Sequence, residues 1–576
     1  MPGAVASATS GVATPTTKLA GSSSSSWKDV AAAKQRSRIE ELPSEWRLPA
    51  ETLAKAAAGT GADLRAIPAS SGILSAAELE ITETLVADIL ANLTSGKWTS
   101  EAVTVAFCKR AAIAHQLTNC LTEFFWQEAV EQAKAYDQHF QKHGKPFGPL
   151  AGLPISLKDN FNLKGKDTNL GFVAWINDPM PNDSTLVTLL RDQGAVLYCK
   201  TTTPTAMMIA ETVSNANGRT LNPFNTNLTS GGSSGGESAL LALKGSPLGV
   251  GTDIGGSIRI PCSFTGLWGL KPSFGRFPTH GCRSGLAGQE AVMSINGPMC
   301  VAPEGLEIYG KSVVDTEPWT VDPKCVPLPW TPVAESSLPE SLTVLMITNN
   351  GLATPTPPLQ RAMSEAASKL KAAGHTVIEW DASKTSADTE LFARGQDFIE
   401  TFFRAEGGGT IQGLMAASGE DADWVVGLAE TDPSWGRSVA ELWKVQAART
   451  SWAGEMLAKF KELSKGVKID ALVSPVAAEV ATTHDAYHHI FYTGCWNLMD
   501  MPAVIFPLPN FSVDKAHDCK SKFDFSPRHE KEAKVWDQYN VDDVHGMPVC
   551  LQVVGHRLQE ERTIAVARKL HSACSA

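Results

Sequence analysis

The chain between residues 27 and 145 repeats apolar side chains at helical spacing. Ser75 and Glu78 have the spacing of a capping box, which begins a helix. Two further helices are predicted over residues 99–113 and 127–141, where apolar positions recur every three or four residues. We therefore predict that residues 27–145 form a helical region that packs on the core. The apolar stripe after the capping box consists of Leu85, Val86, Ile89, Leu90 and Leu93.

From about residue 150 the pattern changes to short apolar runs that alternate with helices. A closing helix is predicted over residues 559–571. This alternation is typical of an α/β fold, so we predict a large mixed, twisted sheet sandwiched by helices (α/β/α) over residues 146–576. The predicted strands are Leu153–Leu157, Ala195–Cys199, Pro247–Gly251, Leu342–Thr348, Thr376–Trp380, Ala471–Ser474, Ala503–Pro507 and Val549–Val554.

Two later segments depart from the alternation. Residues 385–465 form a mainly helical excursion, and we expect its Trp424, Trp435 and Trp443 to pack in the interior. Residues 512–545 are crowded with charge and are predicted to lie on the solvated surface. We also expect part of the substrate pocket wall to come from residues 300–500, without naming the side chains.

Composition narrows the class of protein. The 576 residues carry a net charge of -11, with no basic arm or Lys/Arg stripe, which disfavours nucleic-acid binding. The longest apolar runs are far shorter than a membrane span, so no transmembrane helix is expected. The 11 cysteines include no C-x-x-C pair, which favours reduced thiols and a cytoplasmic location. Residues 1–26 are rich in Ser, Ala, Thr and Gly, lack a secretory signal and are predicted to be disordered.

The segment Thr229–Pro261 carries the candidate chemistry. It reads TSGGSSGGESALLALKGSPLGVGTDIGGSIRIP, with two glycine clusters that each touch a serine and an apolar helix and strand between them. Glycine is needed where the backbone takes a positive φ or approaches a ligand closely. A flexible Gly/Ser linker is the plain alternative, but linkers do not contain an apolar helix and strand. We therefore interpret the segment as a built site.

One alternative site is the nucleophile elbow of an α/β-hydrolase esterase. The pattern G-x-S-x-G occurs twice, centred on Ser233 and on Ser234. The elbow requires a strand that leads into the serine and a helix that leads out. Residues 222–230 are polar and typical of turns, so the sequence predicts no such strand and disfavours this interpretation.

Other catalytic patterns are incomplete. A phosphate-binding loop needs Gly-Lys-Ser/Thr after its glycines, whereas Glu237 and Ser238 stand there. His529-Glu530 does not continue to the second histidine of a zinc protease, so no metal site is predicted. A histidine-based triad is not favoured either. The histidines that could take part are expected to be structural or on the surface: His484, His488, His489 and His545, with Asp485 and Asp500 as partners.

Three motifs taken together resemble the amidase signature family. They are GLPISLKDN with Lys158, GGSSGGES with Ser233 and Ser234, and GTDIGGSIRIP with Ser257. The resemblance runs from about residue 27 to the C-terminus. The segments SGILSAAELEIT, AFCKRAAIAHQLTNCLTEFF and HGMPVCLQVVGHRLQEERT look most like fungal acetamidases and general amidases. Position 238 is Ser where relatives often have Gly or Ala.

The resemblance implies a Ser-Ser-Lys relay. Ser257 would be the nucleophile, Ser233 the bridging hydroxyl after a cis peptide bond, and Lys158 the base. A lysine with its ordinary pKa near 10.4 is almost entirely protonated at neutral pH, so the site must lower that pKa by burial. Lys158 ends the apolar run Leu153–Leu157, which is compatible with burial.

The remaining site residues follow from the same resemblance. Backbone N–H groups of Ile254, Gly255 and Gly256 would form an oxyanion hole, together with that of Ser257. Ser234 would support the relay or cap the following helix. The further supporting residues are Thr252 and Asp253, which lead into the turn, and Arg259, which is expected to fix the loop by an ion pair. The residues expected at the substrate are Met207, Met208 and Gly232.

The family implies hydrolysis of a carboxamide to a carboxylate and ammonia or an amine, through an acyl-enzyme and without a cofactor. Small primary amides are the first expected substrates, and aryl or indole acetamides and longer acyl amides stay open. The expected partner is a small-molecule amide, and a homodimer is left open. The alternative hypotheses are the glutaminase-type subunit of a tRNA-dependent amidotransferase and a non-catalytic scaffold.

Overall fold

The computed structural model describes residues 26–57, 59–421, 432–487 and 489–575. The predicted disordered tail, except for its last residue, lies outside them. The helices predicted near the N-terminus are present, and the capping box is confirmed because Ser75 and Glu78 each bond the other's backbone N–H. The first helices are α1 (Trp27–Glu40), α2 (Ala50–Lys55), α3 (Ile67–Ser70), α4 (Ala76–Glu83), α5 (Val86–Thr94), α6 (Ser100–Thr118) and α7 (Trp126–His143).

An 11-stranded mixed sheet forms the centre of the described chain, in the order β1-β3-β2-β8-β10-β9-β14-β15-β13-β11-β12. Strand β2 runs parallel to both β3 and β8, and β11 runs parallel to β12 and β13. The pairs between β8 and β13 are antiparallel, so the predicted α/β fold with a mixed sheet is confirmed. The strands are β1 (Leu121–Phe124), β2 (Pro154–Lys158), β3 (Val196–Thr201), β8 (Leu248–Asp253), β9 (Trp268–Lys271), β10 (Ile295–Cys300), β11 (Thr343–Asn349), β12 (Thr376–Asp381), β13 (Ala471–Pro475), β14 (Ala503–Ser512) and β15 (Pro548–Val554).

Three strands of this sheet have no counterpart among the predicted runs: β1, β9 and β10. The sequence of β10 is INGPMC, and its glycine and proline are residues that strands disfavour. It nevertheless pairs with β8 along its whole length, and its Gly297 is required because a Cβ there would collide with the Leu270 carbonyl oxygen of β9. Tertiary pairing therefore decides these strands rather than local propensity.

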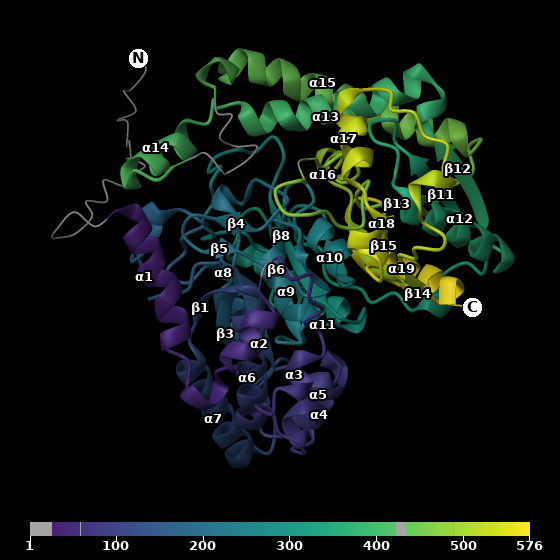
Figure 1. The fold of residues 1–576 in the computed structure, drawn as a ribbon. Coiled ribbons are helices and arrows are strands. Elements are labelled where there is room, and N and C mark those ends of the chain that lie inside the picture. Colours follow the sequence, from purple (N-terminus) through teal and green to yellow (C-terminus); the bar gives the residue numbers. More distant parts are fainter. Residues whose placement is uncertain (1–25, 58, 422–431, 488, 576) are drawn as a thin grey trace, which may run out of the picture.

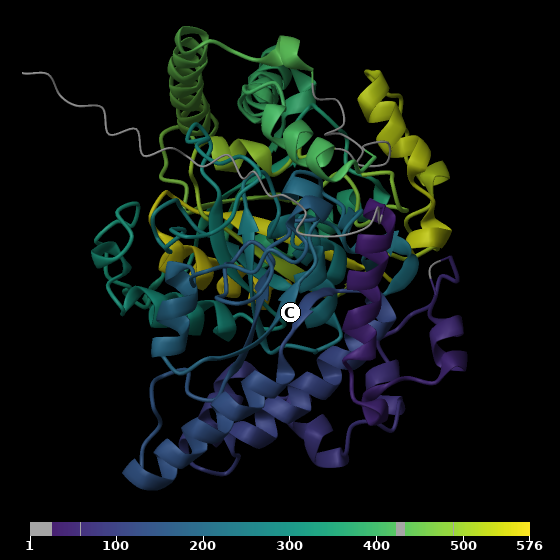
Figure 2. The ribbon, with the colours of Figure 1, turned by 90° about the vertical axis from the view of Figure 1, so that its left-hand side faces the viewer.

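The helices after β1 surround the sheet (Figures 1 and 2). In both views, α13 and α15 lie at one end of the molecule and the α4–α7 group lies at the opposite end. The C-terminal helix packs on β14, and its predicted position is confirmed. These helices are α8 (Thr185–Asp192), α9 (Gly235–Ala242), α10 (Arg259–Thr265), α11 (Glu304–Val314), α12 (Pro357–Ala372), α13 (Ser386–Arg404), α14 (Gly409–Ser418), α15 (Val439–Leu463), α16 (Gly494–Leu498), α17 (Glu530–Gln538), α18 (Val541–Val544) and α19 (Glu560–Ser575).

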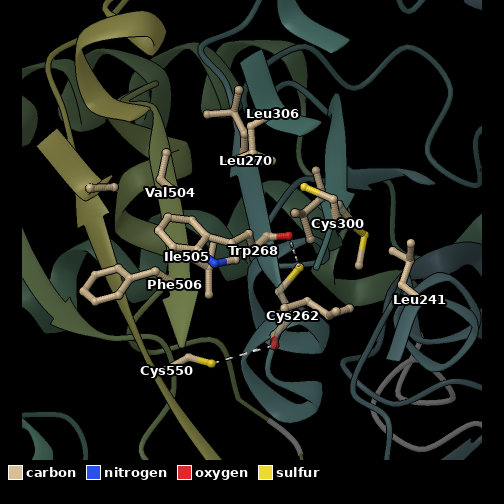
Figure 3. Close-up of a cluster of buried hydrophobic side chains, with 14 of the residues drawn as sticks. Leu241, Cys262, Trp268, Leu270, Cys300, Leu306, Val504, Ile505, Phe506 and Cys550 are labelled. Carbon is tan, nitrogen blue, oxygen red and sulfur yellow. Dashed lines mark hydrogen bonds between the residues drawn. The ribbon is translucent and has the colours of Figure 1, made fainter. Parts of the chain in front are cut away.

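Figure 3 shows part of the core where the middle of the sheet meets α10. The rings of Trp268 and Phe506 lie 5.9 Å apart, which joins β9 to β14. The thiol of Cys262 on α10 donates to the carbonyl of Trp268 at 3.7 Å. This packing anchors α10, and with it the turn that precedes α10, on the centre of the sheet.

The prediction that all three tryptophans of the helical excursion pack in the interior is wrong. Trp443 was expected to pack, but its α15 position leaves it 67% exposed, and Trp424 lies outside the described residues. The charged stretch 512–545 lies mostly on the surface, as predicted. It also contains α17, whose buried Val535 lines a cavity. No helix in the described ranges combines the length and the apolar character that a membrane span requires.

Candidate active site

A cavity of about 630 Å³ opens beside the turn after β8. Ile254, Gly255, Gly256 and Ser257 form part of its lining. The three residues that we expected at the substrate lie here as well: Met207, Met208 and Gly232. The structure therefore brings the predicted nucleophile and these residues together at one cavity.

The opposite wall comes from segments far along the chain. Helix α13 contributes Gln396 and Phe403, and α14 contributes Ile411. The expectation that residues 300–500 supply part of the wall is confirmed. Sequence reasoning did not name these side chains, nor those of α17, because a helix pattern shows which face is apolar but not which cavity it meets. The other wall residues include Arg404, Trp435, Tyr487, His489, Ile490, Lys531 and Lys534.

Lys158 ends β2 and has no exposed surface. Its Nζ donates to Ser233 Oγ at 2.7 Å and to Thr252 Oγ1 at 2.8 Å. Burial lowers the pKa of Lys158 to about 7, although the carboxyls of Asp253 and Glu237 oppose the shift. A neutral amine is thus accessible near neutral pH, and the predicted contact of Lys158 with Ser233 is present. Its bond to Thr252 has no signal in the sequence.

The loop that carries Ser233 is fixed by its glycines. The Gly232–Ser233 peptide is cis, as the family resemblance implies. Gly231 has a φ of 79°, and a Cβ on it would lie 2.8 Å from Pro261 Cα. The Ser234 N–H donates to the Ser257 carbonyl at 3.2 Å, which ties the two serine segments together. Among the described residues, however, no hydrogen bond joins the hydroxyls of Ser233 and Ser257.

Ser234 holds the end of β8. Its Oγ accepts from the Thr252 N–H and lies 3.3 Å from the Thr252 carbonyl, to which it donates. The alternative that its side chain caps the next helix is wrong, because Ser234 stands at the N-cap position of α9 without making a capping hydrogen bond. Its hydroxyl instead fixes the backbone of the residue that binds Lys158.

Asp253 and Arg259 form a buried ion pair across the turn. Arg259 donates to both carboxylate oxygens of Asp253, at 3.0 and 2.9 Å, and to the Thr493 carbonyl at 2.9 Å. Asn497 adds a bond of 2.9 Å to the same carboxylate. Burial would raise the pKa of Asp253, but the charge and hydrogen bonds of Arg259 hold it far below its ordinary value. The pair fixes the loop as expected and favours the ionised form of Asp253.

The turn between this pair presents backbone N–H groups. The Gly256 N–H donates to Asp253 Oδ1 at 2.9 Å, so that donor is already engaged. In the part of the chain that is described, the N–H groups of Ile254, Gly255 and Ser257 bond no protein acceptor. Gly256 has a φ of 141°, and a Cβ on it would lie 2.5 Å from Thr493 Oγ1. Only glycine fits this position of the turn.

The segment before Ser233 differs from the prediction. Residues 225–229 form a short strand, β7 (Asn225–Thr229), where only turns were expected. It pairs with β6 (Leu221–Asn222) in a separate sheet, because Asn222 bonds the Thr229 carbonyl and closes a tight hairpin. A strand therefore does precede Ser233. Within the described residues, no histidine hydrogen-bonds Ser233 or Ser234, so an esterase triad is not assembled there.

The histidines are placed as follows. His484 bonds Glu211 and the Thr226 carbonyl, and His545 bonds the Val513 carbonyl, in agreement with structural roles. His489 bonds Glu479 at 3.0 Å, yet it also lines the cavity. His488 lies outside the described residues. The carboxylates considered as partners, Asp485 and Asp500, pair with Arg219 and Arg557.

The family model for Amidase matches residues 102–564. The chain belongs to the amidase family. An acetamidase of Emericella nidulans is 39% identical to it over 556 residues, which are 95% of this chain and 98% of that relative. An acetamidase of Aspergillus oryzae is 38% identical and covers 94% of this chain, with 98% of its own length matched. A solved fatty acid amide hydrolase superposes with a TM-score of 0.87 at 30% identity and covers 96% of this chain and 95% of that one.

Membership decides the reaction class. The enzyme is a hydrolase that acts on amides. A 6-aminohexanoate cyclic dimer hydrolase, at 20% identity and a TM-score of 0.68, shares the fold. The match to the acetamidases extends over nearly their whole length, so the comparison covers the helical excursion and α17 as well as the signature motifs.

Proposed function

We propose that the enzyme hydrolyses carboxamides through Ser257 as nucleophile, Ser233 as bridging hydroxyl and Lys158 as base. The observation that carries the proposal is the buried 2.7 Å contact between Lys158 Nζ and Ser233 Oγ, beside a cavity that Ser257 lines. A serine hydroxyl becomes a strong nucleophile only when a base removes its proton. Lysine serves as that base in known variants of the serine triad.

The reaction proceeds in two halves. Ser257 Oγ attacks the amide carbon while its proton passes through Ser233 to Lys158. The tetrahedral adduct then expels ammonia or an amine, which takes that proton, and leaves an ester on Ser257. Water attacks the ester by the same relay and releases the carboxylate. The proposal needs the Ser257 hydroxyl to turn toward Ser233, because that bond is not made among the described residues.

The oxyanion of the adduct would be held by backbone N–H groups. Ile254, Gly255 and Ser257 have N–H groups without a protein acceptor in the described chain, whereas the Gly256 donor is used by Asp253. We therefore assign the hole to those three and give Gly256 the role of shaping the turn. One such donor is worth about 3–4 kcal/mol in other enzymes.

The size of the cavity bears on the substrate. The acetamidase relatives favour a primary amide. A cavity of about 630 Å³, whose lining is mostly aromatic and aliphatic but also includes Arg404, Lys531 and Lys534, is much larger than acetamide requires and is in the range that binds drug-sized ligands. We therefore propose a general amidase whose preferred substrates carry a larger apolar acyl group, with acetamide as a poor one.

A fluorophosphonate probe and an amide panel test these assignments. The probe should label the wild type and the Ser234→Ala variant, and labelling should vanish in Ser257→Ala. Labelling that persists in Ser257→Ala and vanishes in Ser233→Ala or Ser234→Ala would instead favour an esterase. The rates of ammonia release from acetamide, phenylacetamide, indole acetamide and long-chain amides then show which acyl group the enzyme prefers.

Location and assembly belong to the proposal too. All 11 cysteines are free, which supports a reducing compartment, and we propose the cytoplasm. Full-length matches to acetamidases speak against the glutaminase-type subunit of an amidotransferase, which would require a stable partner. Purification of the native enzyme followed by light scattering distinguishes a monomer, a homodimer and a complex with a second chain.

A further inference from the structure

Glu237 is a buried carboxyl next to the relay that the proposed mechanism does not use. It lies on α9 and has no exposed surface. The Ser156 hydroxyl donates to its Oε1, and the Thr201 hydroxyl donates to its Oε2 at 2.8 Å. A Cβ on Gly249 would collide with the carboxyl, so β8 accommodates it only through a glycine. These contacts describe a position built for a carboxyl group.

Both partners of Glu237 flank Lys158 on the sheet. Ser156 stands two residues before Lys158 on β2, and alternate residues of a strand point to the same face. Thr201 is the residue of β3 that pairs with Lys158 in the strand register. Helix α9 also begins directly after Ser233 and Ser234. The Glu237 carboxyl thus fastens the helix of the bridging serine to the strand of the base.

The proton relay creates a charge problem in this interior. When Lys158 takes the proton of Ser257 it becomes an ammonium ion, and a buried ion is costly unless an opposite charge lies nearby. Asp253 and Glu237 are the two carboxyls that act on Lys158. Asp253 is already engaged by Arg259 and Asn497. In the described chain, Glu237 bonds only hydroxyl groups, so its charge is uncommitted.

We propose that Glu237 is a positioning residue whose carboxylate supplies the counter-charge for the Lys158 ammonium formed in the reaction. This inference rests on the proposed function, because it requires Lys158 to be the base. It extends that function by assigning a fourth side chain, outside the three signature residues, that acts through Lys158 without touching the substrate.

The titratable groups near Glu237 do not reverse the effect of its charge on the pKa of Lys158. Besides Lys158, the titratable groups that interact electrostatically with Glu237 are thiols and a phenol, and burial raises the pKa of each so that all stay neutral near pH 7: Cys120, Tyr198, Cys199 and Cys262. Burial raises the pKa of Glu237 itself to about 7, against the hydrogen bonds of Ser156 and Thr201. Its charge therefore appears in the pH range where the relay must operate.

The charge acts on Lys158 in two ways. An ionised Glu237 favours the ammonium form, so it raises the pKa of Lys158. Glu237→Gln should therefore let Lys158 lose its proton at a lower pH and should also make the ammonium less stable during the reaction. The acid limb of the activity profile should move to lower pH while the plateau falls. A defect in packing alone would lower the plateau without moving the limb.

The experiment measures the rate of fluorophosphonate labelling of the full-length chain between pH 5 and 10. In this reaction the Ser257 oxygen bonds to phosphorus, fluoride leaves, and the serine proton goes to Lys158. For Glu237→Gln we expect the acid limb to shift down by about one pH unit and the plateau to fall by about tenfold. Thr201→Val, which removes one donor to the carboxylate, should shift the limb in the same direction by less.

Ser238→Ala is the matched control. It removes a hydroxyl on the same helix that bonds the Ser230 and Gly235 carbonyls at 3.1 Å and carries no charge, so its acid limb should stay in place. A limb unmoved in both Glu237→Gln and Thr201→Val, with Ser257→Ala still unlabelled, would overturn the role of Glu237 and leave the relay intact. Labelling that survives Ser257→Ala would overturn the proposed function itself. Should Glu237→Gln fail to fold, Thr201→Val decides.

Discussion

Lys158 is charged in the unfolded chain and can be neutral in the folded one. Its Nζ has two hydroxyl partners, Ser233 and Thr252, and no carboxylate hydrogen-bonds it in the described residues. Hydroxyl oxygens can accept from either protonation state of the amine, so they fix its position without fixing its charge. Charge is then set by burial and by the two carboxyls further away.

The protonation of Lys158 predicts the pH dependence of the enzyme. As the proposed base, Lys158 must be neutral, and its pKa is lowered to about 7, so kcat/KM should rise as the pH increases through about 7. Lys158→Ala should lose activity by about a hundred- to ten-thousand-fold, and a higher pH should not restore it. Initial rates of amide hydrolysis from pH 5 to 10 measure both the pH dependence of the wild type and the loss of activity in Lys158→Ala. Near-wild-type rates in Lys158→Ala would remove the lysine from the mechanism.

The Asp253–Arg259 pair predicts a large loss of stability. Arg259→Met leaves the Asp253 carboxylate buried without its cation, which should cost about 3–5 kcal/mol of unfolding free energy. Arg394→Met is the control, because the Arg394–Glu455 pair is exposed and should contribute at most about 1 kcal/mol. Urea unfolding of both variants compares them. Equal losses in the two would mean that the buried pair is not needed for the turn.

These residues differ in how well the sequence foretells them. Lys158, Ser233 and Ser257 stand in local motifs, so their juxtaposition could be expected. Glu237 left a weaker signal: a single carboxyl in the apolar helix GGESALLA. The hydrogen bond from Lys158 to Thr252 had no sequence signal, because it depends on the register of β2 against β8, which cannot be read from the sequence.

At the scale of elements, helices α13 and α15 pack closely where small residues allow it. Gly395 of α13 faces the ring of Trp452 on α15, whose indole N–H donates to the Leu391 carbonyl at 2.7 Å. Gly454, on α15, has nothing within 4 Å of the place where a Cβ would stand. Glycine is therefore required at the first position and only tolerated at the second.

This contrast gives a paired prediction. Gly454→Ala should stabilise the enzyme by about 0.5–1 kcal/mol, because alanine loses less backbone entropy in a helix. Gly395→Ala should destabilise it by about 1–3 kcal/mol, since its Cβ would lie 2.6 Å from Trp452 Cζ2. Thermal unfolding at equal protein concentration reports both. A lower melting temperature for Gly454→Ala would contradict the open surface of α15 at that residue.

Element prediction from sequence succeeded where the signal is local. The Ser75 capping box and the long apolar strands were visible because their patterns are complete within a few residues. Strand β9 has only four residues, WGLK, and its place in the sheet comes from β10 and β14 on either side. The prediction that Trp443 is buried was wrong for a related reason: the sequence of a helix does not reveal whether another element covers its tryptophan.

At the scale of the whole molecule, the cavity joins parts of the chain that no local pattern connects. The side that carries the proposed nucleophile comes from the turn after β8, and other parts of the lining come from α13, α14 and α17. Sequence reasoning could predict that later residues contribute, yet it could not assign α17, whose many charges masked its buried Val535. Assembly of the wall depends on tertiary packing over most of the chain.

A tryptophan placed on the wall should separate large from small substrates. Leu286→Trp adds bulk to the cavity lining. We expect kcat/KM for phenylacetamide to fall by about tenfold or more and that for acetamide to change by less than about twofold. Val321→Trp, at a residue that is 52% exposed, is the control and should alter neither. A parallel fall for both amides would mean that the cavity does not hold the acyl group.

The relay side chains fall between residues 158 and 257, whereas much of the far wall falls between 396 and 538. Much of the cavity wall can therefore change without altering the stretch that holds the proposed relay, although Met207, Met208 and Gly232 line the cavity from within that stretch. Substitutions in the later stretch could therefore change the substrate specificity of a related enzyme while Lys158, Ser233 and Ser257 stay the same. Chimaeras that exchange only this later stretch between two relatives are the natural way to transplant selectivity.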